Sequence, residues 1–457
     1  MQLSSPFFLL ILLPLSFLLL LPLPRKTRLS LLAPLFAAWY VAANYGNTVG
    51  ILAVLSLPLF SYLLALPAPD LLPRVRMAVG VLLPLAAVLT ARLTAELGMS
   101  GMRYPYGITL VALASISATV DRLRSKAPVP QNPLIFITYI LFFPVLALGP
   151  VIRYRQFIAA CDAQEERLLH CHCGVRLYMW GFIKQLAIAA PMYRAIGQIL
   201  AGGDGVLNPF TALMLPLFAF LFLYFLVGGC TDMARGIAEL LGITTPRNQK
   251  TPFSARHPLD LLFFMHRSLT AYLTEYVGAP LARRGTPAAK RLAALLILLC
   301  FLLFFRARPE ILLFMLPLAA LCLLPRLPRN RWGRAALYVL SFLSVAFFAL
   351  AAVTEDPISL FRLYATVLVK KAPYQFYLAY SAISGARLLY VTVGFCVLAL
   401  LFSRFYPLWL RKLPSRARSV CRTAQTVLLL TLFLFSFLYF LPQFPQYADL
   451  PYLGFFV

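Results

Sequence analysis

One histidine lies in the hydrophobic stretch "LLFFMHRSLTAYLTEY" (261–276), in a chain that has only four histidines. A neutral imidazole at His266 could take a proton from a hydroxyl group, and Ser268 and Glu275 follow it closely. A core histidine with a hydrogen-bond partner fits the same spacing. Because a lone histidine is weak evidence of chemistry, these residues by themselves favour the structural role.

A second polar stretch, "FFPVLALGPVIRYRQF" (142–157), contains two prolines and a glycine that break a helix. Arg153 and Tyr154 follow the break directly. Broken backbone at membrane depth is tolerated where it lines a cavity or is covered by protein. The alternative is a simple span end with arginines that extend to the membrane surface.

The third polar stretch is "VGGCTDMARGIAELLGITTPRNQKTPF" (227–253). Its two glycines permit close packing, and Asp232 and Arg235 are spaced to neutralise each other across one helical turn. The sequence then predicts a helix stop and an extended polar loop that carries Asn248.

These stretches lie in a chain that is 61% hydrophobic and only 12% charged, far below the usual share of charge in soluble domains. Its apolar runs are continuous, which disfavours spanning strands. The sequence predicts an all-α polytopic membrane protein with about 10–12 membrane-embedded helices. The candidate runs lie near 6–24, 31–45, 49–66, 77–97, 105–120, 133–150, 173–200, 209–228, 258–274, 291–305, 310–324, 335–353, 387–403 and 424–441.

Basic clusters in the loops predict the topology. The first apolar run lacks a basic leader and a cleavage site, so we expect a retained span with its N-terminus outside. The last run follows the basic segment 411–422, which also places the C-terminus outside. The residues expected in the cytoplasm are Arg25, Lys26, Arg28, Arg74, Arg76, 121–126 and 411–422.

The net charge of +26 belongs to these loops, where positive-inside bias and anionic lipids explain it. We therefore expect membrane lipids as partners and no nucleic acid. The cysteines resemble small core residues, and the isolated "HCHC" at 170–173 is too weak a pattern for a zinc site. No metal is expected, and residues 1–457 are treated as a single transmembrane domain.

Four segments, in this order, resemble the membrane-bound O-acyltransferase family, in particular its bacterial branch of alginate O-acetylation and D-alanyl transfer subunits. In the last segment Asp260, Tyr272 and Glu275 replace the family's Glu, Trp and Asp. The segments are "YGITLVALASISATVDRLRSK", "FFPVLALGPVIRYRQF", "GGCTDMARGIAELLGITTPRNQKTPF" and "DLLFFMHRSLTAYLTEYVGAPL".

The resemblance implies a ring of tilted helices around a central tunnel in the bacterial cytoplasmic (inner) membrane. A donor, acyl-CoA or an acyl-carrier protein, would enter from the cytoplasm, and a hydroxyl acceptor from the other side. The expected partners are that carrier protein and an extracytoplasmic transferase, with no tightly bound cofactor. His266 would be the base or orienting group; the expected substrate or tunnel residues are Arg153, Tyr154, Asp232, Asn248, Ser268 and Glu275.

The chain departs from the family at the second motif histidine. The alignment puts Phe305 and Arg306 at the Trp and His positions, and no histidine follows His266. A permanently charged arginine cannot be a general base, although it can stabilise an oxyanion. Either His266 carries the chemistry with Arg306 as an electrostatic helper, or the chain keeps only a scaffold, lipid-binding or partner-recruiting role.

The tail "PQFPQYADLPYLGFFV" (442–457) is expected outside the membrane. Leu450, Tyr452 and Phe455 resemble the "F-Y--F" ending of the bacterial branch. The Tyr452 hydroxyl could accept the acyl group and pass it to an outside partner. An aromatic belt at the lipid headgroups explains the same residues.

Overall fold

The structure is a computed structural model that includes every residue of the chain. It describes residues 8–20, 22–67, 72–96, 104–125, 127–129, 132–163, 167–201, 209–252, 260–283, 285–305, 311–323, 330–354, 364, 393–394, 396, 409–410 and 412–440. Contacts between Cα atoms divide the chain into two compact units. Unit 1 comprises 1–178, 230–247 and 452–457, and unit 2 comprises 179–229 and 248–451.

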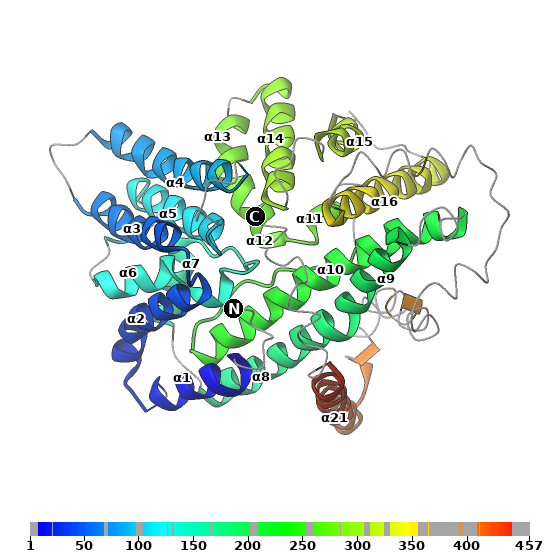
Figure 1. Cartoon of the computed structure of the whole chain (residues 1–457), viewed down its shortest axis with the longest axis horizontal. Helices are drawn as coiled ribbons and strands as arrows, with labels where there is room; N and C mark the ends of the chain where they lie inside the picture. Colours follow the sequence, from blue (N-terminus) through cyan, green and yellow to red (C-terminus); the bar gives the residue numbers. More distant parts are fainter. Residues whose placement is uncertain are drawn as a thin grey trace. The chain divides into compact units, whose positions relative to one another are not determined.

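The described residues form helices and no strand, so the all-α prediction is confirmed (Figure 1). Elements up to residue 183 are η1 (Phe8–Leu12), α1 (Leu13–Leu20), α2 (Arg25–Ala43), α3 (Thr48–Ala65), α4 (Pro73–Glu96), α5 (Ile108–Leu123), α6 (Pro133–Ile140), η2 (Phe143–Val145), α7 (Tyr154–Asp162) and α8 (Arg167–Ile183). Later elements are η3 (Lys184–Ala189), α9 (Ala190–Ala201), α10 (Pro209–Leu240), α11 (Asp260–Phe263), α12 (Arg267–Leu273), η6 (Thr274–Gly278), α13 (Ala279–Ala282), α14 (Pro287–Phe305), α15 (Ile311–Leu323), α16 (Arg331–Val353) and α21 (Ser415–Phe440).

Six helices of the described part are long and apolar enough to cross a membrane, namely α3, α4, α10, α14, α16 and α21. The chain is therefore a multi-pass membrane protein. The expected total of about 10–12 embedded helices, their ring and its tunnel stay predictions.

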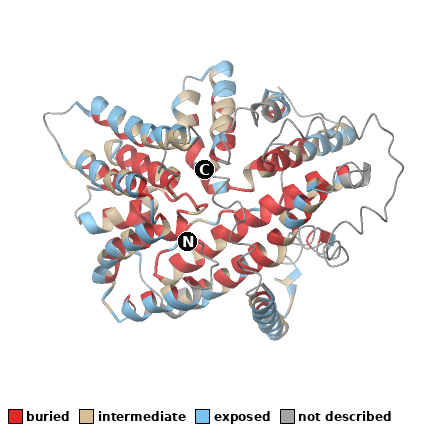
Figure 2. Ribbon diagram, viewed as in Figure 1, coloured by how far each residue is buried: buried red, intermediate tan, exposed pale blue. Residues whose placement is uncertain are grey.

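Burial differs sharply among these helices (Figure 2). In α10, 83% of the apolar window is buried, whereas α4 and α21 each bury only 11% of theirs. The exposed positions on α4 and α21 are largely leucine, valine and aromatic side chains. Such surfaces are stable against lipid tails but not against water, which fits helices at a protein–lipid boundary.

Three expected spans differ from the helices observed. The run 133–150 is not one helix, because α6 ends at Ile140. Pro144 lies four residues beyond, where its ring would clash with the Ile140 carbonyl. The run 209–228 is too short, since α10 continues to Leu240. The run 258–274 is divided into α11 and α12 at His266.

Glycines let helix backbones approach closely in both units. In unit 1, a Cβ built on Gly236 of α10 would lie 2.7 Å from the Gly174 carbonyl oxygen and 2.7 Å from the Tyr178 nitrogen. In unit 2, a Cβ on Gly229 would lie 2.8 Å from the Gly181 carbonyl oxygen. Small residues at helix contacts are typical of membrane proteins, where close packing replaces the hydrophobic effect as the associating force.

We predict that Gly236→Ala lowers the thermal unfolding temperature of the detergent-purified protein, because the new methyl group meets backbone atoms that cannot move alone. Overpacking of this kind costs about 1–3 kcal/mol. Gly197→Ala on α9 is the matched control, since a Cβ there has no atom within 4 Å. Alanine should leave that helix unchanged or stabilise it by about 0.5–1 kcal/mol. Equal unfolding temperatures for the two variants would contradict this packing.

Candidate active site

The polar cluster of unit 2 is held by the chain segment that begins at Asn248. The Asn248 carbonyl oxygen accepts a hydrogen bond from the Arg267 N–H at 2.9 Å, and the Lys250 N–H donates to the Phe264 carbonyl oxygen at 3.3 Å. The Lys250 ammonium lies 4.7 Å from the centre of the Phe264 ring. These contacts fix the segment against the residues that precede α12.

The same segment is bound on its other side to α10. The Gln249 side-chain amide donates to the Tyr224 carbonyl oxygen at 2.6 Å, and the Tyr224 hydroxyl donates to the Lys250 carbonyl oxygen at 3.3 Å. Gly228 makes room for this contact, because a Cβ there would overlap the Gln249 side chain. The expected close packing at 228–229 is thus confirmed: Gly228 admits the polar segment, and Gly229 admits the backbone of Gly181.

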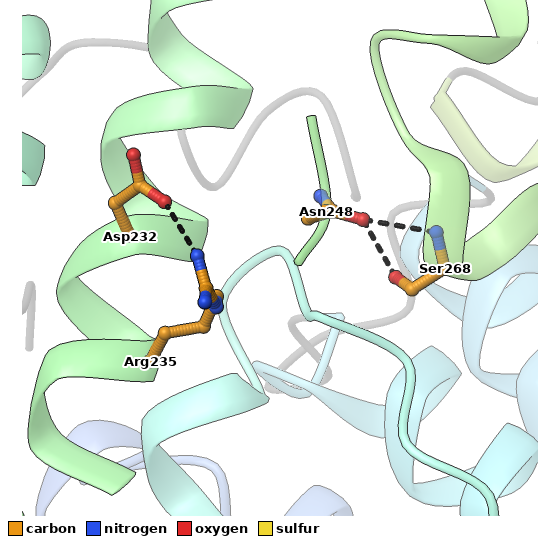
Figure 3. Close-up of polar contacts among 4 residues, drawn as sticks. All are labelled: Asp232, Arg235, Asn248 and Ser268. Atoms are coloured by element: carbon orange, nitrogen blue, oxygen red, sulfur yellow. Dashed lines mark hydrogen bonds and ion pairs between the residues drawn. The ribbon is translucent and has the colours of Figure 1, made fainter. Parts of the chain in front are cut away.

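Asn248 and Ser268 lie together in the interior of unit 2 (Figure 3). The Asn248 Oδ1 accepts two hydrogen bonds from Ser268, one from its N–H at 3.1 Å and one from its hydroxyl at 2.7 Å. Asn248 is fully buried and Ser268 is 7% exposed. Two residues that were predicted separately, twenty positions apart, therefore share one site.

His266 begins α12 as its N-cap. Its Nδ1 accepts a hydrogen bond from the Leu269 N–H at 3.3 Å and lies 3.4 Å from the Ser268 hydroxyl oxygen. The ring is fully buried, and the edge of the Phe304 ring packs against it at 5.5 Å between centroids. His266 has backbone angles φ −142° and ψ 73°, which are not helical, so the helical run breaks here.

The cap determines what the imidazole can do. A backbone N–H only donates, so Nδ1 carries the lone pair and the proton of a neutral ring is on Nε2. In this geometry His266 is a hydrogen-bond donor through Nε2, and it could accept a proton at Nδ1 only by releasing the Leu269 amide.

In unit 1, the broken stretch 142–157 is mostly buried (Figure 2). Part of it, including Phe142, Val145, Leu146 and 150–152, lines a small cavity. The Tyr139 hydroxyl donates to the Ile152 carbonyl oxygen at 2.9 Å and so satisfies one of the backbone groups freed by the break. This arrangement supports the first of the two interpretations of this stretch, in which protein covers the broken backbone, over a simple span end.

Arg153 and Tyr154 lie where the break ends and α7 begins. The Tyr154 N–H donates to the Ser117 hydroxyl at 3.0 Å, and the next amide donates to the Asp121 carboxylate at 3.5 Å. Tyr154 is 1% exposed, and burial raises its pKa to about 12 despite the nearby Arg122 charge. Its phenol is therefore a neutral donor near pH 7 rather than a nucleophile.

Asp232 and Arg235 form the predicted ion pair in unit 1, at 3.3 Å (Figure 3). Both side chains are mostly buried, at 15% and 14% exposed. Mutual neutralisation explains how the buried part of α10 includes this pair of charges.

The sequence did not predict the arginines that donate hydrogen bonds to backbone carbonyl groups at helix C-termini. The Arg25 guanidinium donates to the carbonyl oxygens of Ala160 at 2.8 Å and Gly242 at 3.3 Å, and also to that of Ala163. Arg76 donates to the Leu64 and Leu66 carbonyl oxygens. Cations favour helix C-termini, but no local pattern indicates which helix end a distant arginine reaches.

Arg306, Tyr452 and the tail 442–457 lie outside the described residues, as does the His170 side chain. Glu275 is half-buried on η6. Among the residues that the structure describes, no group of three or more His, Cys, Asp or Glu side chains could hold a metal ion.

Comparison with known proteins confirms the resemblance. A probable alginate O-acetylase AlgI of Pseudomonas putida is 29% identical over 186 residues, which cover 40% of this chain and 38% of that protein. The teichoic acid D-alanyltransferase of Bacillus subtilis is 26% identical over 157 residues, covering 33% and 38%. The peptidoglycan O-acetyltransferase of Helicobacter pylori is 26% identical over 176 residues, covering 35% and 33%.

The chain is a relative of the membrane-bound O-acyltransferases. It spans less than two fifths of the length of the curated relatives that it matches. No family model matches the chain. The relatives' names describe acetyl or D-alanyl transfer.

We predict that His266→Ala speeds hydrogen exchange at the α12 amides, whereas His266→Asn does not. Alanine removes the cap, at a cost of about 0.5–2 kcal/mol, while asparagine is among the best N-cap residues. Exchange measured by mass spectrometry on the peptide that contains Leu269 tests this. Wild-type exchange in the alanine variant would show that the ring does not hold the helix.

Proposed function

We propose that the chain is a membrane acyltransferase that moves a small acyl group, such as acetyl or D-alanyl, from a cytoplasmic donor to an extracytoplasmic hydroxyl. The buried His266–Ser268–Asn248 cluster is the observation that carries this proposal, because its first member is the histidine that aligns with the family motif. The acceptor would be a cell-envelope polymer or exopolysaccharide, since the relatives' names include alginate, teichoic acid and peptidoglycan.

The donor would be a thioester, acyl-CoA or an acyl-carrier protein. In the transfer, the hydroxyl oxygen bonds to the carbonyl carbon, the C–S bond breaks, and the hydroxyl proton ends on the released thiol. His266 orients the reacting groups through its Nε2 proton, as its cap geometry supports. Arg306 assists electrostatically, and an extracytoplasmic transferase completes delivery to the polymer.

Tyr452 serves as a relay in this scheme. Its hydroxyl first receives the acyl group as an ester, and a second transfer to the acceptor hydroxyl restores the phenol. The relay needs the topology proposed from the basic loops, with both termini outside the bacterial cytoplasmic membrane.

The histidine prediction separates chemistry from folding. In liposomes with radiolabelled acetyl-CoA, the wild-type protein should acquire covalent label, and His266→Asn should slow labelling by about 10²-fold or more while it keeps the α12 cap. Labelling is measured over time on the denatured protein. If the wild type transfers no acetyl group, either from acetyl-CoA or from an acetylated carrier protein, the proposed function fails.

The relay prediction uses the smallest change at the tail. Tyr452→Phe removes one oxygen and should abolish the stable label, and peptide mapping of the wild type should place the label on 442–457. Tyr439→Phe, at the end of α21, is the matched control and should label normally. Full labelling of Tyr452→Phe would rule out the relay.

A non-catalytic role is the second candidate, favoured by the absence of any histidine after His266. The chain would then recruit or hold a partner that performs the transfer. In cells, this role predicts that His266→Asn leaves polymer acylation intact while deletion of the gene abolishes it.

A further inference from the structure

Asn248 has a buried donor that no group in the described part of the chain satisfies. The residue is fully buried, and its Nδ2 has no hydrogen-bond partner among the residues that the structure describes. A buried amide nitrogen without a partner is destabilising, and native proteins rarely keep one unless water, an ion or a ligand completes it. The position of this nitrogen therefore points to an acceptor that the protein receives from outside.

The orientation of the amide is fixed by its neighbour. Oδ1 accepts from the Ser268 N–H at 3.1 Å and from the Ser268 hydroxyl at 2.7 Å (Figure 3). Turning the amide over would place its NH₂ group against a backbone N–H, which is a donor as well. The amide therefore has one orientation that fits its neighbours, and in that orientation Nδ2 is the atom that lacks a partner among the described residues.

The surroundings define the chemistry of the missing acceptor. The Ser268 hydroxyl oxygen is 2.7 Å from Asn248 Oδ1, to which it donates, and 3.4 Å from His266 Nδ1, so it lies between the amide and the imidazole. Asn248 and His266 are both fully buried, and a neutral donor in such a medium interacts strongly with an oxygen that carries partial negative charge. A carbonyl oxygen, whose charge grows as a nucleophile attacks, meets this description.

We propose that the Asn248 side-chain amide binds the carbonyl oxygen of the acyl group that is transferred. This inference rests on the proposed function. As the acceptor oxygen bonds to the carbonyl carbon, the carbonyl oxygen gains charge, and the Nδ2 protons stabilise it. When the C–S bond breaks, the carbonyl re-forms and the amide releases the ester.

Asn248→Asp tests the proposal, because aspartate keeps an oxygen for both Ser268 hydrogen bonds and replaces the donating NH₂ with an acceptor. Loss of one such donor lowers kcat by about 10²–10³-fold. We expect that fall in kcat for acetyl transfer from acetyl-CoA, with little change in KM. Asn330→Asp is the matched control: Asn330 is exposed, and its Oδ1 caps α16 through the Gly333 N–H at 2.9 Å. Aspartate caps equally well, so its rate should equal that of the wild type.

Infrared spectroscopy of acetyl-CoA with ¹³C at the carbonyl provides a measurement that does not depend on the variant's folding. Bound to the wild type, the carbonyl stretch should move to lower frequency than in free acetyl-CoA, and a folded Asn248→Asp protein should lose this shift. An unshifted band in the wild type would overturn the proposal. An Asn248→Asp variant with the kcat of the wild type would also overturn it. In that case Nδ2 of the wild type binds only a water molecule, and the proposed function stands. If the wild type transfers no acetyl group, the proposed function fails, and the assignment of Asn248 with it.

Discussion

The buried backbone of this chain must find its hydrogen-bond partners inside the protein, because lipid offers none. Helix ends are where this constraint is hardest to meet, since several N–H and C=O groups there have no partner within the helix. The structure meets it at α7 with side chains from remote segments, Asp121 and Ser117 at the start and Arg25 at the end. At the start of α12 it uses a local cap, His266.

The candidate active site is one product of that constraint. His266 is buried because it caps a helix, and Asn248 is buried because its segment is hydrogen-bonded to α10 on one side and to the residues before α12 on the other. The cap leaves the imidazole with a donating Nε2, and the segment leaves Asn248 with a donating Nδ2. Two donors that the fold itself positions suit a reaction in which negative charge develops on oxygen and sulfur.

Local patterns predicted the local features well. The helical class follows from continuous apolar runs, and the Asp232–Arg235 pair follows from a three-residue spacing on a helix. Features that depend on distant segments were not predictable. No pattern near Arg25 points to the ends of α7 and α10. The end of α6 at Ile140 was predictable from Pro144 but was hidden within a continuous apolar run.

The most direct measurement of the central claim is the position of a bound donor. A cryo-EM structure of the protein with a non-transferable acetyl-CoA analogue, in which a methylene replaces the thioester sulfur, would locate the acyl carbonyl. The account predicts the carbonyl oxygen within hydrogen-bonding distance of Asn248 Nδ2, beside the His266 ring. An analogue bound elsewhere, with this cluster closed and unoccupied, would contradict it.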